Sequence, residues 1–204
     1  MSEAAKARVI ACDIFKPELD AVLRAMRDGG ARRYTGREVE VTYLPSLLHS
    51  DFDKLAAAVD AEARAYGGCA PFMLLYGAKC HPNWDGVLSG HRAVCFGESN
   101  CVQLISGQAA EPGASRDFYI TTGWIRGWPG FRGDDAALGL TPGKCRAMFA
   151  HHCDRAVFFD TGVCVPLPEE TAFFEKTTGL LIERKPVGIE IFAGKFLDAL
   201  KRLG

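Results

Sequence analysis

Two patterns of apolar and polar positions alternate along this chain of 204 residues. Short apolar runs, typical of buried parallel strands, occur at residues 8–13, 72–76, 92–96 and 155–160, and an alternating run at 38–44 also predicts a strand. Further strands are predicted at 118–121 and 180–184. Between the strands, apolar residues recur at helical spacing, which predicts helices beginning at Pro17, Asp51 and Pro142, one near residue 99, and two more over 168–178 and 195–203. This alternation predicts an α/β fold with three layers, in which a mostly parallel sheet has helices on both faces.

The chain shows no internal repeat and no linker, so we predict a single α/β domain over residues 1–204, with a loop insert at about 108–135. Within the insert, residues 123–133 are rich in Gly, Trp and Phe, and we interpret them as an ordered loop. Its Trp124 is a candidate for lining a pocket for a flat ligand, or for covering the core beneath the loop.

Composition excludes several classes of partner. The net charge is −1, so we expect no nucleic acid and no anionic membrane surface as a partner. No apolar run approaches the roughly 20 residues that span a bilayer, and residues 1–15 show no long apolar leader, so we expect a cytoplasmic protein. Motifs of dinucleotide-binding, P-loop and α/β-hydrolase proteins are absent, and a homo-oligomer is left open.

Eight cysteines are present, and a long chain with an ample core and no leader favours reduced thiols. Cys12, Cys80 and Cys101 each follow a predicted strand. Because the carboxyl ends of parallel strands meet at one edge of a sheet, we expect these three thiols to lie close together. Thiolates bind zinc, iron in clusters or copper(I), and His49 is the imidazole that we assign as an additional ligand, with His81, Glu98 or water as alternatives. The sequence therefore predicts a metal ion, zinc or iron, or an iron–sulfur cluster.

Two other functions stay open. In a metal-free enzyme, Cys80 would be the nucleophile, with Lys79 to polarise it and His81 or His49 as the base. Lys79 and a helix N-terminus at Cys101 are both expected to lower thiol pKa values. In a non-catalytic module that binds a small ligand or a partner, an exposed apolar patch is expected around Trp124, Trp128 and Phe131.

Polar residues at the strand ends are candidates for binding a ligand. Asp160, Thr161 and Gly162 follow the strand at 155–160 and can anchor a phosphate or a hydroxyl group, or form a turn. Asn100, in the segment after the fourth strand, is a further candidate for the same role.

Several short stretches together resemble a known family. They are Ala11-Cys12, Pro17-Glu18-Leu19, Tyr43-Leu44-Pro45 with Leu48-His49, Tyr76-Gly77-Ala78-Lys79-Cys80, residues 100–107 (NCVQLISG), Thr122-Gly123-Trp124 and Asp160-Thr161-Gly162. On these stretches the chain resembles the DUF1638 family, whose members are often linked with corrinoid-dependent methyl transfer in anaerobes. The resemblance implies a role near corrinoid or metallocofactor chemistry, with a corrinoid as a possible cofactor and a corrinoid protein or methyltransferase as partner.

The chain departs from the family pattern beside two of the cysteines. Lys79 precedes Cys80 and His81 follows it, and Ser99-Asn100 stands where family members carry acidic or imidazole groups. The cysteines themselves are retained, but hard metal ligands next to Cys101 are lost.

Overall fold

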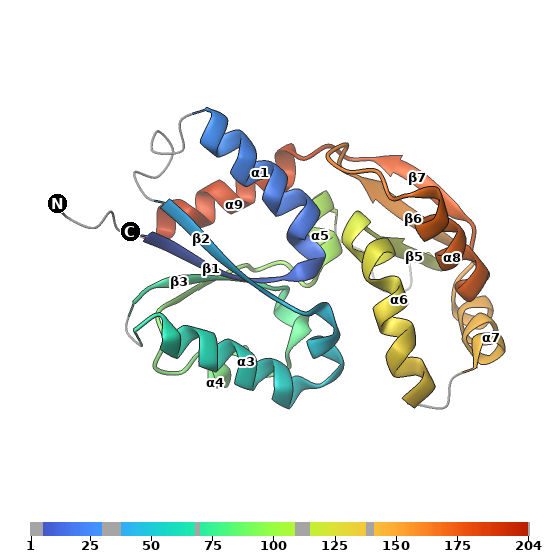
Figure 1. The fold of residues 1–204 in the computed structure, drawn as a ribbon, viewed down its shortest axis with the longest axis horizontal. Coiled ribbons are helices and arrows are strands. Elements are labelled where there is room, and N and C mark those ends of the chain that lie inside the picture. Colours follow the sequence, from blue (N-terminus) through green and yellow to red (C-terminus); the bar gives the residue numbers. More distant parts are fainter. Residues whose placement is uncertain (1–5, 30–37, 68–69, 109–114, 138–140, 204) are drawn as a thin grey trace.

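A computed structural model describes residues 6–29, 38–67, 70–108, 115–137 and 141–203 of the protein. In these residues the strands form two parallel sheets (Figure 1). Sheet A has the order β2-β1-β3-β4, and sheet B has the order β5-β6-β7. The strands are β1 (Lys6–Cys12), β2 (Glu38–Leu44), β3 (Phe72–Leu75), β4 (Ala93–Cys95), β5 (Asp117–Ile120), β6 (Arg155–Asp160) and β7 (Ile182–Pro186). The predicted fold class is confirmed, although the strands divide between two sheets instead of forming one.

Helices cover both faces of each sheet. They are α1 (Lys16–Asp28), α3 (Phe52–Ala65), α4 (Trp84–Val87), α5 (Cys101–Ser106), α6 (Thr122–Ala137), α7 (Pro142–His152), α8 (Pro168–Thr178) and α9 (Glu190–Arg202), with 3-10 helices η1 (Asp13–Phe15), η2 (Ser46–Ser50) and η3 (Ala78–Cys80). Figure 1 shows α1 and α9 on one face of sheet A and α3 on the other. No helix of the described segments is long and apolar enough to cross a membrane.

Apolar periodicity accounts for the core of sheet A. Val9 and Ile10 of the central strand β1 are buried on opposite faces, and β3 is buried throughout, as a continuous apolar run predicts. Leu19 and Val22 form the buried stripe of α1. Asp51 caps α3, because its carboxylate accepts a hydrogen bond from the backbone N–H of Lys54 at 3.1 Å.

Helix α5 connects the two sheets. One face of sheet B packs on α6 to α8, with Phe158 against Trp128 and Phe174 in one cluster. The other face packs on α5, where Val157 meets Val102, and α5 also contacts α9 of the first sheet. The segment that begins at Cys101 is therefore held between both halves of the molecule.

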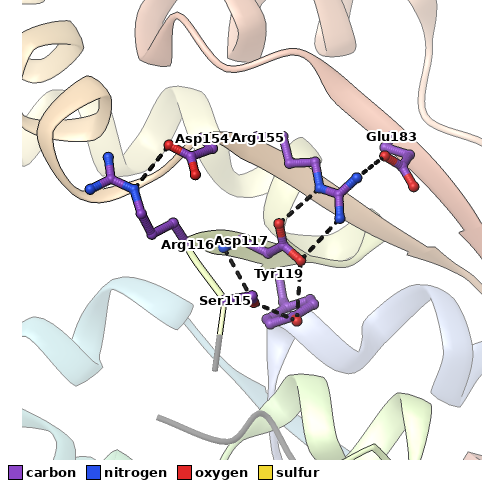
Figure 2. Close-up of polar contacts among 7 residues, drawn as sticks. All are labelled: Ser115, Arg116, Asp117, Tyr119, Asp154, Arg155 and Glu183. Atoms are coloured by element: carbon purple, nitrogen blue, oxygen red, sulfur yellow. Dashed lines mark hydrogen bonds and ion pairs between the residues drawn. The ribbon is translucent and has the colours of Figure 1, made fainter. Parts of the chain in front are cut away.

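An ion-pair network crosses the amino ends of the sheet B strands (Figure 2). Arg155 on β6 donates to Asp117 on β5 at 2.8 Å and also pairs with Glu183 on β7. Asp117 and Arg155 are direct partners in the strand register. Arg116 and Asp154 form a neighbouring exposed pair at 2.9 Å. One guanidinium thus spans three strands, which helps to fix their register at the end of the sheet opposite to their carboxyl ends.

The interpretation of residues 123–133 as a loop is wrong, because they belong to α6, and the expected insert at about 108–135 also contains β5. Trp124, Trp128 and Phe131 recur at i, i+4 and i+7, and they form the apolar stripe of this helix. Pro129 inside the helix costs about 3 kcal/mol, which burial of aromatic rings at this spacing offsets. The expected exposed patch is also absent from these rings, because Trp128 is only 6% exposed and the other two pack on the core.

Candidate functional site

Three predicted thiols meet where sheet A faces the second half of the molecule. Cys12 ends β1, Cys80 ends η3 just after β3, and Cys101 begins α5. The thiols are close enough that a charge on Cys80 or Cys101 raises the pKa of Cys12, and a charge on Cys80 raises the pKa of Cys101. The three cysteines that the sequence places at strand ends therefore lie in one region of the fold, within range of each other's charge, and their role as metal ligands stays a prediction.

A close backbone contact holds Cys80 beside Cys101. The backbone N–H of Ala78 donates to Glu98 O at 2.8 Å, and that of Lys79 donates to Ser99 O at 2.9 Å. A Cβ atom on Gly77 would lie 2.4 Å from the Cα of Asn100, so only glycine fits this crossing. The loop after β3 therefore lies directly on the loop that enters α5.

Asn100 has a structural task at this crossing. Its side-chain oxygen accepts from the backbone N–H of Gln103 at 2.9 Å and caps α5. Its role as a ligand-binding residue stays a prediction.

Burial keeps the thiols protonated. It raises the pKa of Cys12 well above the usual value, and raises that of Cys80 as well. Burial also raises the pKa of Cys101 to about 12, although the indole N–H of Trp124 donates to its Sγ at 3.2 Å and opposes the shift. The expected lowering of the thiol pKa values is wrong, because desolvation outweighs the N-terminus of α5 and the Lys79 side chain points to solvent.

Polar groups surround the thiols. The hydroxyl group of Tyr76 is buried, lies near Cys80, and interacts with the Cys12 thiol, which helps to raise the pKa of the tyrosine. Asp13 is near enough to raise the pKa values of Cys12 and Tyr76. The imidazole of His49 lies between Trp124 and Phe131, at 5.9 and 5.7 Å between ring centroids. Burial lowers the pKa of His49, so at neutral pH its ring is uncharged, the form that binds metals.

The described segments hold no group of three or more His, Cys, Asp or Glu side chains already placed around one point as metal ligands. The donor types nevertheless suit a soft ion: three thiols, with a neutral imidazole on the same side of the fold.

His81 and Lys79 are arranged differently from the expectation for a thiol enzyme. His81 is buried, but its Nδ1 accepts from the backbone N–H of Asn83 at 3.0 Å and its ring packs on Trp84. The pKa of Cys80 responds to burial and to the Gly77 backbone, and neither predicted partner acts on it. The catalytic roles of Cys80, Lys79 and His81 stay predictions, without a contact in the described residues that favours them.

The segment after β6 forms a turn that closes on α1. The Asp160 carboxylate accepts from the backbone N–H of Gly162 at 2.9 Å and also pairs with Arg184, so both its oxygens are engaged. Gly162 has φ +76°, which favours glycine. Thr161 donates to the carboxylate of Glu18 at 3.2 Å. Asp160 and Gly162 therefore support the turn, and a role of this segment in binding a ligand stays a prediction.

Sequence reasoning assigned no role to Asp13, Tyr76 or Glu18, although it places Asp13 beside Cys12 at the end of the first strand. Asp13 and Tyr76 carried a weak signal, because each stands at the carboxyl end of a predicted strand beside a candidate cysteine. Glu18 carried none, because an acidic residue in the first turn of a helix usually faces solvent. Here it is fully buried.

Neither the curated proteins nor the solved structures contain a match to this sequence. A family model described as a protein of unknown function (DUF1638) matches residues 43–194. The matched range includes Cys80, Cys101 and Trp124, and Cys12 precedes it. Because the match spans most of the 204 residues, the chain belongs to the DUF1638 family.

Proposed function

We propose that this protein binds a soft metal centre, a zinc or iron ion or an iron–sulfur cluster, through Cys12, Cys80 and Cys101. The observation that carries the proposal is the proximity of three thiols from separate elements: Cys12 is buried, Cys80 and Cys101 are half-buried, and charges on Cys80 and Cys101 act on the pKa of Cys12. His49 is the candidate for a fourth ligand, because its ring is neutral and packs beside Trp124, which also contacts Cys101.

Burial favours a metal ligand over a free nucleophile. A nucleophilic cysteine needs a lowered pKa, whereas all three thiols here have raised values. A bound cation replaces the protons and supplies the positive charge that buried thiolates otherwise lack. The metal-free thiol enzyme is therefore the weaker alternative.

Trp124 supports the proposal from outside the ligand set. Its N–H donates to the sulfur of Cys101 at 3.2 Å. Hydrogen bonds to ligand sulfurs orient them and tune the potential of iron–sulfur centres. A metal or cluster held here would have thiolate ligands with a fixed donor on one of them.

The family resemblance supports a finer proposal, that the metal centre serves corrinoid-dependent methyl transfer beside a corrinoid protein or a methyltransferase. We further propose that the protein works in the cytoplasm, where reducing conditions keep thiols free. Seven described cysteines are free thiols, in keeping with such a compartment.

Elemental analysis and absorption spectroscopy of protein purified without oxygen test the proposal. We expect stoichiometric zinc or iron in the wild type, its loss in Cys80→Ser, and its retention in Cys95→Ser, which changes an exposed thiol of β4 outside the site. Metal-free wild-type protein would end the proposal, and so would equal metal in both variants.

A further inference from the structure

A cavity of about 370 Å³ lies between α1, the start of α6 and the segment after β6. Its walls carry Lys16, Asp20 and Arg24 from α1, Gly123 and Arg126 from α6, and Asp13 from η1. It is separate from the three thiols, none of which lines it.

The acidic groups of the cavity wall are already engaged. Asp20 pairs with Lys16 at 3.3 Å and accepts a hydrogen bond from the hydroxyl group of Tyr43 at 2.6 Å. Asp13 accepts from the backbone N–H of Ser46 at 2.8 Å. Lys16 offsets the charge of Asp20 while Asp13 keeps its own, so the lining carries three cationic side chains, Lys16, Arg24 and Arg126, against two carboxylates.

Two arginines of the wall keep free donors. Within the described segments, no hydrogen bond or ion pair engages Arg24. Arg126 is 39% exposed; it lies 3.7 Å from Glu170, which is longer than a hydrogen bond, and its charge also acts on the buried Glu18. Since a guanidinium has five N–H donors in a planar fork that matches a carboxylate or a phosphate, this wall is suited to an anion.

The cavity adjoins the thiol cluster, formed by Cys12, Cys80 and Cys101, at two points. Asp13 lines it and raises the pKa of the adjacent Cys12. Gly123 lines it and precedes Trp124, which donates to Cys101. A Cβ atom on Gly123 would lie 1.9 Å from the carbonyl oxygen of Ile14, so the start of α6 is pressed onto η1. A molecule in the cavity would thus lie next to the residues that hold two of the thiols.

We propose that this cavity binds a small anionic molecule whose carboxylate or phosphate group is held by Arg24 and Arg126. The volume is near the lower end of the roughly 300–1,000 Å³ range of ligand pockets, which fits a small metabolite better than a macrocycle. Anion binding stands on the cavity alone.

Calorimetric titration of the full chain with inorganic phosphate and, separately, with succinate tests the proposal. We expect saturable binding of at least one probe, and the stronger probe identifies the preferred anionic group. Arg24→Gln and Arg126→Gln should each weaken binding about tenfold or more, because each removes a charged donor. Arg27→Gln is the matched control, since Arg27 is also exposed on α1 but does not line the cavity.

The proposal is overturned if neither phosphate nor succinate shows saturable binding at millimolar concentration. It is also overturned if Arg24→Gln and Arg27→Gln weaken the binding of the probe equally. Arg24→Lys keeps the charge and should recover part of the affinity, which separates charge loss from misfolding. Cys80→Ser should bind the anion like the wild type while losing its metal. Failure of the anion site and failure of the metal site are therefore observed separately.

Discussion

Glu18 is the residue at which burial and charge conflict most strongly. Its side chain is 0% exposed, one carboxylate oxygen accepts from Thr161, and the other has no hydrogen-bond partner among the described residues. Desolvation raises its pKa from about 4.5 to about 7, although hydrogen bonds and the charge of Arg126 oppose the shift. The carboxyl group of Glu18 therefore changes charge near neutral pH at the contact between α1 and the segment after β6.

The pKa of Glu18 predicts a pH dependence of stability. Below pH 4.5 the carboxyl is protonated in both the folded and the unfolded states and has no effect. Between pH 4.5 and 7 the unfolded state loses the proton first, so the free energy of unfolding falls as pH rises, by about 3 kcal/mol in total. Glu18→Gln should remove this fall, as measured by urea unfolding at pH 5 and pH 8.

The control for this measurement is Glu38→Gln, which changes an exposed carboxyl on β2. Its free energy of unfolding should change between pH 5 and pH 8 as much as that of the wild type. If Glu18→Gln also shows the wild-type change, the buried carboxyl is not the group responsible for the pH dependence of stability.

The three thiols predict an unusual release of protons on metal binding. Because burial raises all three pKa values, with that of Cys101 at about 12, the thiols stay largely protonated at pH 9. Three ordinary thiols with pKa 9.0 would release about 1.5 protons per zinc ion at that pH, whereas this site should release between two and three. Calorimetry in two buffers of different ionisation enthalpy measures the number, and a value at or below 1.5 would contradict the raised pKa values.

At the scale of elements, the crossing of two loops positions the thiols. Gly77→Ala places a methyl group 2.4 Å from the Cα of Asn100, so it should destabilise the protein by roughly 1–3 kcal/mol and weaken metal binding by separating Cys80 from Cys101. Gly97→Ala is the matched change, because its Cβ would meet no atom within 4 Å, and it should alter stability by less than about 0.5 kcal/mol. Denaturant unfolding and metal content check both variants, and equal effects would show that the crossing is unimportant.

Helix α6 provides a second matched pair of glycines. Gly130→Ala meets only Leu47, at 3.7 Å, so it should stabilise the protein by about 0.5–1 kcal/mol through helix propensity. In Gly123→Ala the added methyl group would lie 1.9 Å from the carbonyl oxygen of Ile14, so this change should destabilise the protein by at least about 1 kcal/mol. Thermal unfolding distinguishes them, and stabilisation by both would show that α6 moves freely relative to η1.

The elements that could be predicted are those whose local signals agree. The run at 155–160 and the Asp51 cap give β6 and the start of α3 as expected. In α6, glycines and Pro129 signal a loop, while the spacing of Trp124, Trp128 and Phe131 signals a helix. Tertiary packing of these rings decides the outcome, and it depends on residues far away in the sequence.

At the scale of the whole molecule, the division into two sheets could not be predicted. β4 and β5 both show strand patterns, but no local feature indicates that β4 ends one sheet and β5 begins another. Proximity of the thiols could be predicted, because strand order in a parallel sheet brings carboxyl ends together. Burial of the thiols could not, because it depends on tertiary packing: Cys12 lies within the core of sheet A, and Cys80 and Cys101 pack against the same cluster.

The thiol cluster also predicts how the two halves are coupled. Cys12 ends a strand of sheet A, and Cys80 follows another. Cys101 begins α5, which packs on sheet B, and its sulfur accepts a hydrogen bond from the Trp124 N–H of α6. A metal that binds only the folded state stabilises it by mass action, and through Cys101 this effect should reach both halves. Hydrogen exchange of the wild type with and without a chelator should show faster exchange in α5 and α6 as well as at the end of β1 when the metal is removed. In Cys80→Ser the chelator should change nothing. Faster exchange confined to the segments around Cys12 and Cys80 would show that the site belongs to sheet A alone and that α5 does not transmit its occupancy.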